Sequence, residues 1–170
     1  MLQKKFIQSI KEIEKILKKE TMGFLGLSMN DQPYVVPMTY GYSNGKIFFH
    51  CSLKGKKLDY IRSNPQVCFT VGWQSGRIMR HPQGARCKAN HDSVICYGRA
   101  RVIEDLNKRC EVLNIFNHCL KADAKEINPE EVINCLAVEI KINRMTGRRQ
   151  RNGGEHTYWE YNFKQNKVTF

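Results

Sequence analysis

The sequence predicts a mainly β protein: an antiparallel barrel or sandwich with helices at its flanks. Several runs of β-branched, aromatic and other apolar residues are separated by turn residues, and Asn44-Gly45 joins two of them as a two-residue hairpin would. Helical periodicity is confined to residues 3–20, 55–64 and 106–120. Because helices do not alternate regularly with strands, a doubly wound parallel fold is disfavoured.

The first predicted element is an amphipathic helix over residues 3–20. Its apolar residues recur at the i, i+3, i+4 and i+7 spacing of one helical face. They are Phe6, Ile7, Ile10, Ile13, Ile16 and Leu17. Since glutamates are interleaved with the lysines of the opposite face, we expect a solvated face rather than one that binds a membrane or RNA.

Three strand-like runs follow this helix. They read GFLGLSM, YVVPMTYGY and KIFFHCS, and turns are expected between them at 30–32 and 43–45. These runs predict three consecutive antiparallel strands. The short helix over 55–64 then ends at Asn64-Pro65, because the residue before a proline disfavours the helical conformation.

The second half of the chain adds more strands and one longer helix. Gly98 predicts a bulge or bend within its strand. A polar, basic loop is expected over 74–92, and a last short strand is expected near Val168. The strands are expected at 67–73, 93–104 and 135–142, and the helix at 106–120.

Length and charge limit the class of protein. The chain has 170 residues, 41% of them hydrophobic, which suits one compact domain. We expect this domain over 1–148 and a basic, aromatic extension over 149–170.

A net charge of +12 favours nucleic acid, an anionic membrane surface or a phosphorylated ligand as a partner. Because no apolar run approaches the roughly 20 residues that cross a bilayer, and none resembles a signal peptide, we expect a cytoplasmic protein without membrane contact.

Seven cysteines are spread through the chain without a C-x-x-C pair. Their odd number and wide spacing argue against a disulfide framework, so we expect buried, reduced thiols. His81, Cys87 and His91 carry metal-binding side chains, but a structural zinc site usually needs four ligands in tight pairs. We therefore expect no metal site.

A polar, lysine-rich segment lies where the third strand leads into a helix. His50, Ser52, Lys54, Lys56 and Lys57 fall within eight residues. The N–H groups and dipole of a helix start favour an anion, which a hydroxyl and lysines would also bind. This segment can therefore hold a phosphate. The alternative is that Ser52 only caps the helix while the lysines are solvated.

Pro37 interrupts the strand-like run from Val35 to Tyr40. Proline removes one ladder donor and is disfavoured in a central strand, so this strand has an edge, a bulge or a ligand beside it. An edge alone would explain Pro37. With an anion-binding segment one hairpin away, we favour a ligand whose planar ring has a polar edge. The dinucleotide and phosphate-loop motifs G-x-G-x-x-G and G-x-x-x-x-G-K-[ST] are absent from the sequence.

Taken together, these segments resemble a known family. The run from GFLGLSM to QVCFTV, followed by SVICYGRARVIED and VEIKINRMTG, resembles the pyridoxamine 5′-phosphate oxidase-like split barrels, particularly the nitroimidazole-resistance flavoproteins. The resemblance covers about residues 5–148. It implies a six-stranded antiparallel split barrel that forms a homodimer with FMN at the subunit interface.

The resemblance also implies a set of cofactor-binding residues. The strand that lines the flavin ring matches Val36, Pro37, Met38 and Thr39. The positions near the ribityl chain and phosphate match His50, Ser52, Lys56 and Lys57, and the set includes Phe49 and Cys51.

The resemblance to the nitroimidazole-resistance group aligns His50 with that group's histidine beside the flavin, and this implies that His50 is the candidate catalytic residue. An imidazole titrates near neutrality and can deliver the protons that accompany electron transfer to a nitro group. The alternative is that His50 only hydrogen-bonds the cofactor or substrate.

We therefore expect an FMN-dependent oxidoreductase that reduces a small organic acceptor, such as a nitroimidazole, with electrons from NADH, NADPH or another donor. A flavin-binding module without turnover is the first alternative. A nucleic-acid-binding protein that uses the +12 charge is the second and less favoured one. For the segment from Arg148 onward we weigh two alternatives. In the first, Arg148, Arg149 and Arg151 recognise the phosphate of a nicotinamide cofactor or of a partner subunit's flavin while Trp159 and Tyr161 cover the ring; in the second, which we favour, the segment is a disordered basic tail.

Overall fold

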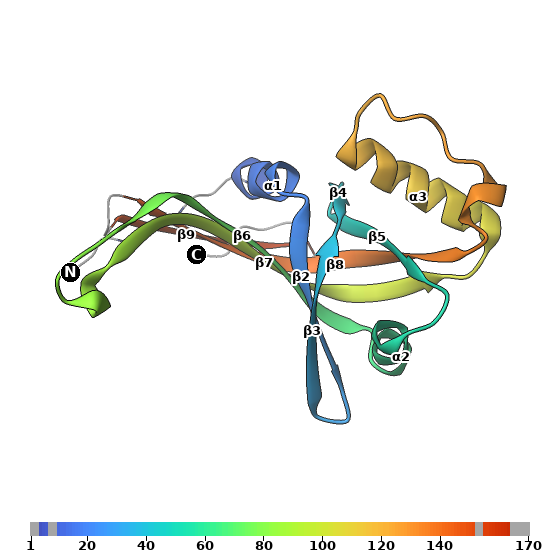
Figure 1. The fold of residues 1–170 in the computed structure, drawn as a ribbon, viewed down its shortest axis with the longest axis horizontal. Helices are drawn as coiled ribbons and strands as arrows, with labels where there is room; N and C mark the ends of the chain where they lie inside the picture. The colour runs from blue at the N-terminus through green and yellow to red at the C-terminus, as the bar shows by residue number, and fades with distance from the viewer. Residues whose placement is uncertain (1–3, 7–9, 152–154, 164–170) are drawn as a thin grey trace.

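The computed structural model describes residues 4–6, 10–151 and 155–163. In these residues the fold is mainly β: one sheet of nine strands is flanked by three α-helices (Figure 1). The strands are β1 (Lys4–Phe6), β2 (Met22–Met29), β3 (Gln32–Thr39), β4 (Gly41–Ser43), β5 (Lys46–Ser52), β6 (Gln66–Met79), β7 (Lys88–Ile103), β8 (Cys135–Arg151) and β9 (Glu155–Asn162). The helices are α1 (Ile10–Lys19), α2 (Lys56–Ser63) and α3 (Leu106–Leu120), with short 3-10 turns at Gly84–Arg86 and Pro129–Val132.

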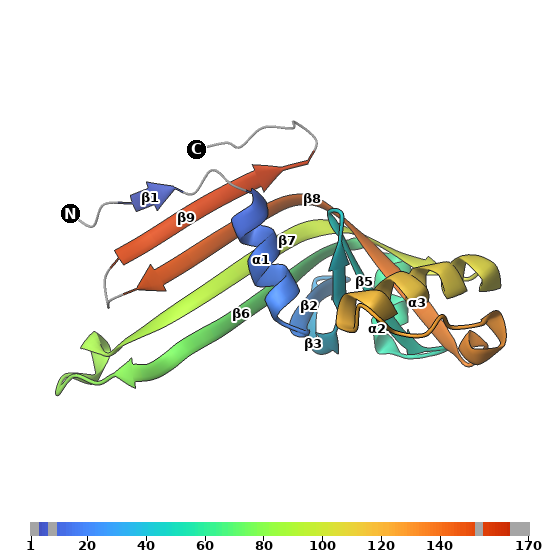
Figure 2. The same cartoon turned by 90° about the horizontal axis from the view of Figure 1, so that it is seen from above.

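The sheet divides at β8. One edge of this strand pairs with β7 over most of its length, whereas the other edge pairs first with β5 and then with β9. The main path of the sheet is β1-β9-β8-β7-β6-β2-β3, and all pairings are antiparallel except that of β1 with β9. Figure 2 shows that β6 to β9 extend as long neighbouring strips away from α2 and α3.

The prediction of six strands is wrong. The strands β6 and β7 continue into residues 74–92, where a loop is expected, and β8 runs past residue 142 to Arg151. Residues 155–162 then form β9 against β8 instead of a disordered tail. The polar composition of these segments hides their structure, because each strand is held by backbone hydrogen bonds to its neighbours rather than by an apolar pattern.

Only part of the N-terminal helix forms as predicted. Ile13, Ile16 and Leu17 are buried on α1, as the periodicity indicates. Lys4–Phe6 instead forms β1, because the free edge of β9 offers a backbone ladder that a helical pattern cannot reveal. Residues 7–9 of the predicted helix, and Val168 with its predicted strand, lie outside the described residues.

The predicted hairpin between β4 and β5 is confirmed. Asn44 and Gly45 have φ of 48° and 73°, the left-handed values that a type I′ turn requires. The helices α2 and α3 and the irregular register beside Gly98 are also confirmed. The prediction of three consecutive antiparallel strands is not confirmed. Its second run divides into β3, which pairs with β2, and β4, whose hairpin with β5 pairs with β8.

Two apolar clusters form the core. The larger cluster joins α1 and α2 to the sheet, and the smaller one lies under α3.

All seven cysteines are free. Burial strongly raises the pKa of the Cys96 thiol, which therefore behaves as a small apolar side chain in the larger cluster. None of the helices in the described residues is long and apolar enough to cross a membrane.

Asp92 is a buried carboxylate that two arginines of β8 hold in place. It is 3% exposed, and it accepts hydrogen bonds from Arg149 Nε at 2.9 Å and Arg151 Nη2 at 2.8 Å. Arg149 Nη1 also lies 3.7 Å from Glu12 Oε2 on α1. Burial alone would raise the pKa of Asp92, but the hydrogen bonds from Arg151 and Arg149 outweigh it and lower the pKa. This cluster ties α1 to the extended part of β7 and β8.

The substitution Asp92→Asn should therefore lower the free energy of unfolding at pH 7 by roughly 3 kcal/mol, because it leaves Arg151 without a carboxylate and Arg149 with only that of Glu12. Urea unfolding measures this change. The matched control Asp123→Asn, at a side chain that is 85% exposed, should leave stability unchanged.

The loss of stability caused by Asp92→Asn should depend on pH. The pKa of folded Asp92 is lowered, so its contribution is complete above its ordinary pKa of about 4 and disappears as pH falls through the lower folded value. The stability difference between wild type and Asp92→Asn should therefore shrink below about pH 4. A difference that stays constant into strong acid would contradict the ion pairs.

Gly147 gives a steric test of the β8–β9 pairing. It lies directly opposite Trp159, and a Cβ at residue 147 would overlap the indole ring. Gly147→Ala should therefore destabilise the protein by about 1–3 kcal/mol in urea unfolding. Gly84→Ala is the control, because a Cβ there meets nothing within 4 Å. Equal stability of the two variants would contradict the placement of β9.

Candidate functional site

The helix α2 begins without a side-chain cap. Its N-cap residue is Gly55, and no side chain of the described residues caps its first turn. The alternative that Ser52 caps this helix is therefore wrong. The positive end of the helix dipole and the first N–H groups remain open to an anion.

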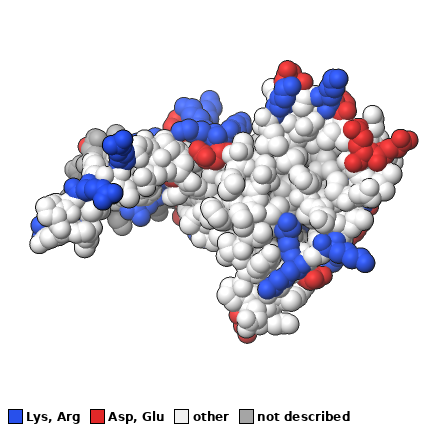
Figure 3. All heavy atoms as spheres, viewed as in Figure 1, with Lys and Arg blue, Asp and Glu red and all other residues white. Residues whose placement is uncertain are grey.

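Cationic side chains surround this helix start. Figure 3 shows lysine and arginine atoms gathered over α2. Lys54, Lys56 and Lys57 line a hollow of about 170 Å³ together with Ser52 and Tyr34. Cys51, Gly55 and Leu58 complete its lining. We call this hollow and its lining residues the α2 corner. Three lysines and a hydroxyl are the donor set that a phosphate group prefers.

Lys57 connects the α2 corner to β3 and β5. Its Nζ lies 3.2 Å from Met38 Sδ and 5.8 Å from the centre of the Phe49 ring. The strands β3 and β5 do not pair with each other in the described sheet. The helix α2 is therefore the element that brings the predicted ring-binding strand close to the predicted phosphate-binding residues.

Two tyrosines lie beside Lys56 at the α2 corner, and no motif in the sequence predicts their role. The rings of Tyr34 and Tyr60 lie 5.3 Å apart, and Lys56 Nζ lies 4.9 Å and 5.5 Å from their centres. Such cation–π contacts orient a lysine without neutralising its charge. The signal for Tyr34 is its spacing, because it shares a strand face with residues 36 and 38.

The ten predicted cofactor-binding residues differ in exposure. Pro37, Thr39, His50, Ser52 and Lys56 are exposed, Val36 and Lys57 are half-buried, and Met38, Phe49 and Cys51 are buried. Side chains alternate along a strand, so Phe49 and Cys51 point into the core. Burial raises the pKa of the Cys51 thiol against the opposing effect of Lys57, which keeps it protonated and unreactive at neutral pH.

His50 lies on the other face of β5, beside α3. Its ring packs edge-on against Phe116, with 5.5 Å between the ring centres. Ser52 follows it on the same face. The exposed imidazole is thus held by an aromatic contact while its outer side faces solvent.

The strand β3 lies at an edge of the sheet, which confirms the edge that Pro37 predicts. Pro37 lies directly opposite Phe24 of β2. Phe24 is 45% exposed, and the neighbouring Met22 and Val35 are 59% and 63% exposed. An apolar, uncovered surface therefore adjoins the predicted ring-binding residues.

The candidate arginines at 148, 149 and 151 belong to β8, and Trp159 and Tyr161 belong to β9. Trp159 is 3% exposed, which is incompatible with covering a ligand ring. Arg149 and Arg151 bind Asp92, and Arg148 donates to Gln150 at 3.1 Å. The structure thus gives these residues positions within β8 and β9.

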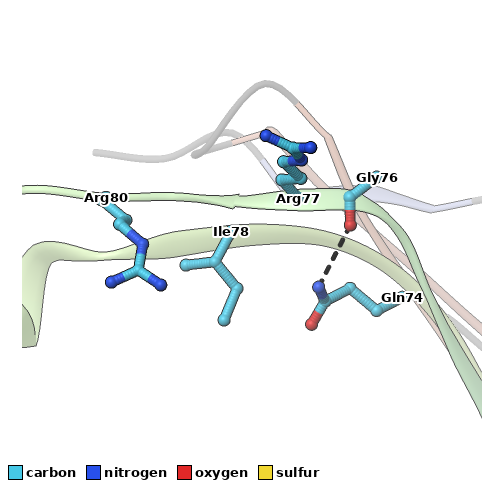
Figure 4. Close-up of a pocket in the computed structure, with 5 residues that line it drawn as sticks. All are labelled: Gln74, Gly76, Arg77, Ile78 and Arg80. Atoms are coloured by element: carbon cyan, nitrogen blue, oxygen red, sulfur yellow. Dashed lines mark hydrogen bonds between the residues drawn. The ribbon is translucent and has the colours of Figure 1, made fainter.

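A larger hollow, of about 720 Å³, lies near the end of β6. Figure 4 shows Gln74, Ile78 and Arg80 on one side of the strand and Arg77 on the other, with a hydrogen bond of 3.2 Å from Gln74 to the carbonyl of Gly76. None of the predicted cofactor-binding residues lines it. Of the residues that the structure describes, no three His, Cys, Asp or Glu side chains gather as metal ligands.

Comparisons with known proteins agree with this fold. The sequence profile of the pyridoxamine 5′-phosphate oxidase family matches residues 9–149. An uncharacterized protein of Rhizobium meliloti (strain 1021) is 32% identical over 92 residues, which make up 48% of this chain and 60% of that protein. The chain thus matches less than two thirds of this relative.

Three solved structures are similar. A candidate 5-nitroimidazole antibiotic resistance protein from Bacteroides thetaiotaomicron has 26% identity and a TM-score of 0.69, over 83% of this chain and 84% of that one. An FAD-binding protein from Mesorhizobium loti has 27% identity and a TM-score of 0.63, over 84% and 96%. The flavocytochrome Anf3 from Azotobacter vinelandii has a TM-score of 0.72 over 86% of this chain and 69% of that one. At 19% identity, this similarity shows the fold alone.

Proposed function

The chain belongs to the pyridoxamine 5′-phosphate oxidase family, and from this membership we propose that it is an FMN-dependent oxidoreductase. The α2 corner is the observation that carries this proposal. It offers an uncapped helix start, a hydroxyl and three lysines at the end of the strand that holds His50. The similarity to an FAD-binding protein supports a flavin ligand, and the similarity to a candidate nitroimidazole-resistance protein supports a nitroimidazole as the acceptor.

The residues present fit the phosphate of FMN. Ser52 would donate its hydroxyl, and Lys56 and Lys57 would supply charge-assisted hydrogen bonds. A dianionic phosphate would also interact favourably with the positive end of α2. Lys56 is already oriented by two tyrosine rings, so little side-chain entropy is lost when the anion binds.

The flavin ring would lie along β3, at Val36, Pro37, Met38 and Thr39. The corner itself encloses only about 170 Å³, less than the roughly 300–1,000 Å³ typical of small-molecule sites. The flavin ring would therefore need a further protein surface to cover it. The uncovered apolar surface at Phe24 and Val35 suits a second copy of this chain, so we propose a homodimer with FMN between its subunits.

The bound flavin would supply the electron transfer, from NADH, NADPH or another donor to a small organic acceptor such as a nitroimidazole. The protein would orient the flavin and exclude water from its ring. His50 would deliver a proton to the reduced acceptor, since its ring is exposed and is fixed by Phe116. A flavin-binding module without turnover would share every binding residue and lack this step.

The double substitution Ser52→Ala/Lys56→Ala should weaken FMN binding about a hundredfold, because it removes one neutral and one charged hydrogen-bond donor. Quenching of flavin fluorescence during titration measures the affinity. The matched control Ser28→Ala/Lys11→Ala changes two exposed residues of the same types and should bind FMN as wild type does. Equal affinity of the two double variants would contradict phosphate binding at the α2 corner.

The substitution His50→Ala separates chemistry from binding. FMN affinity should stay within a factor of about two, whereas the rate of nitroimidazole reduction should fall about a hundredfold. Anaerobic stopped-flow absorbance with NADH or NADPH follows this rate, and His81→Ala is the control histidine. If His50→Ala released FMN instead, His50 would be a binding residue. If wild type also failed to reduce any acceptor, the non-catalytic alternative would hold.

A further inference from the structure

Three cations stand in one row across the neighbouring strands β5, β8 and β7. Lys141 of β8 lies directly opposite both Lys46 of β5 and Arg99 of β7. Directly opposite residues share one face of a sheet, and neighbouring strands are about 4.8 Å apart, so the row spans roughly 10 Å. Like charges in such positions destabilise a sheet. The row is therefore a site of unbalanced positive charge.

One carboxylate offsets this charge in part. The Glu139 side chain is 12% exposed and lies 2.9 Å from Lys46 Nζ and 3.4 Å from Arg101 Nη2. Among the described residues, Arg99 and Lys141 have no carboxylate within ion-pair distance. Four cations and one carboxylate leave three positive charges in this small area.

The row lines a hollow of about 520 Å³. Arg101, Glu139, Pro65 and Ala100 complete the lining with the three cations of the row. This volume falls within the range of small-molecule sites, roughly 300–1,000 Å³. No residue of this hollow belongs to the α2 corner, and Phe48, buried under α3, lies between Lys46 and His50 on β5. The hollow is thus separate from the proposed flavin site.

We propose that this hollow binds the diphosphate group of a small molecule, either a nucleoside diphosphate or a dinucleotide. Lys141 would lie between the two phosphates, while Lys46 and Arg99 would each contact one of them. Arginine binds phosphate oxygens in a bidentate manner, and lysine acts as a point charge. A single phosphate would reach only part of a row about 10 Å long. A nucleic-acid strand needs a longer cationic path, which Glu139 interrupts.

Isothermal titration of the full-length protein with inorganic pyrophosphate tests this site. Arg99→Gln/Lys141→Gln should bind pyrophosphate about tenfold more weakly than wild type, because two charge-assisted contacts are lost. Lys11→Gln/Lys108→Gln removes the same charge from exposed helix positions and should bind as wild type does. Lys56→Gln/Lys57→Gln should lose only binding at the α2 corner, so pyrophosphate binding that remains in this variant, and is lost when Arg99→Gln/Lys141→Gln is added, belongs to this hollow. Equal weakening in Arg99→Gln/Lys141→Gln and Lys11→Gln/Lys108→Gln would mean a general charge effect and would overturn the proposal.

Further ligands identify the source of the diphosphate. ADP binding more tightly than NADH would assign a nucleoside diphosphate, and the reverse order would assign a dinucleotide. Orthophosphate binding as tightly as pyrophosphate would overturn the proposal, and so would a single-stranded oligonucleotide that binds more tightly than either and depends on Arg99 and Lys141.

The unbalanced charge of the row should also lower the stability of the protein when no ligand is bound. At low ionic strength, Lys141→Gln should raise the melting temperature by about 1–3 °C, because it removes the central like charge of the row. Physiological salt should reduce this gain, since it screens exposed charges. A lower melting temperature in both conditions would show that the row carries no excess repulsion, and the proposal would fail.

Discussion

The pairing of β8 is the constraint on which the rest of this structure depends. With β7 along one edge, the other edge can accept two partners in succession, β5 and then β9. The first pairing fixes β5 and therefore the place where the chain turns into α2. The second extends the sheet beyond the helices and uses Gly147 to admit the indole of Trp159. A single strand thus positions the α2 corner and supports the long strips of β6 to β9.

The high positive charge is distributed unevenly. Some of it is neutralised inside the fold, where Arg149 and Arg151 hold Asp92. Unbalanced groups remain at the α2 corner and in the row of Arg99, Lys141 and Lys46. Acidic side chains gather instead near α3 in Figure 3. Part of the net charge of +12 therefore lies at the two surfaces where we propose that anions bind.

The sequence predicts the elements whose signals are local. The Asn44-Gly45 turn, α2, α3 and the irregularity at Gly98 follow from turn chemistry and helical periodicity, and Pro37 marks an edge strand. The extended ends of β6, β7 and β8 could not be predicted in the same way. Their residues are polar, and only the neighbouring strands make them strands. Neither prediction for Trp159, that it covers a ligand ring or lies in a disordered tail, places it in the core, because nothing local indicates that Gly147 leaves room for it.

The residues of the candidate site could be predicted from the sequence, but their arrangement in space could not. The sequence places Ser52, Lys56 and Lys57 at a helix start, whereas only the fold shows that Lys57 reaches Met38 across strands that do not pair. Likewise, the row at Lys141 depends on the register of three strands, which distant parts of the chain supply. Register is a tertiary property, since a slip of one residue would move each side chain to the opposite face.

We propose that a flavin occupies the α2 corner and the adjoining edge of β3 between two copies of the chain. Size-exclusion chromatography of the wild-type protein after incubation with FMN, monitored in the visible range, tests it most directly. We expect the oxidised-flavin absorption bands to elute with a dimer. A colourless protein peak, with all of the FMN eluting as free cofactor, would contradict it.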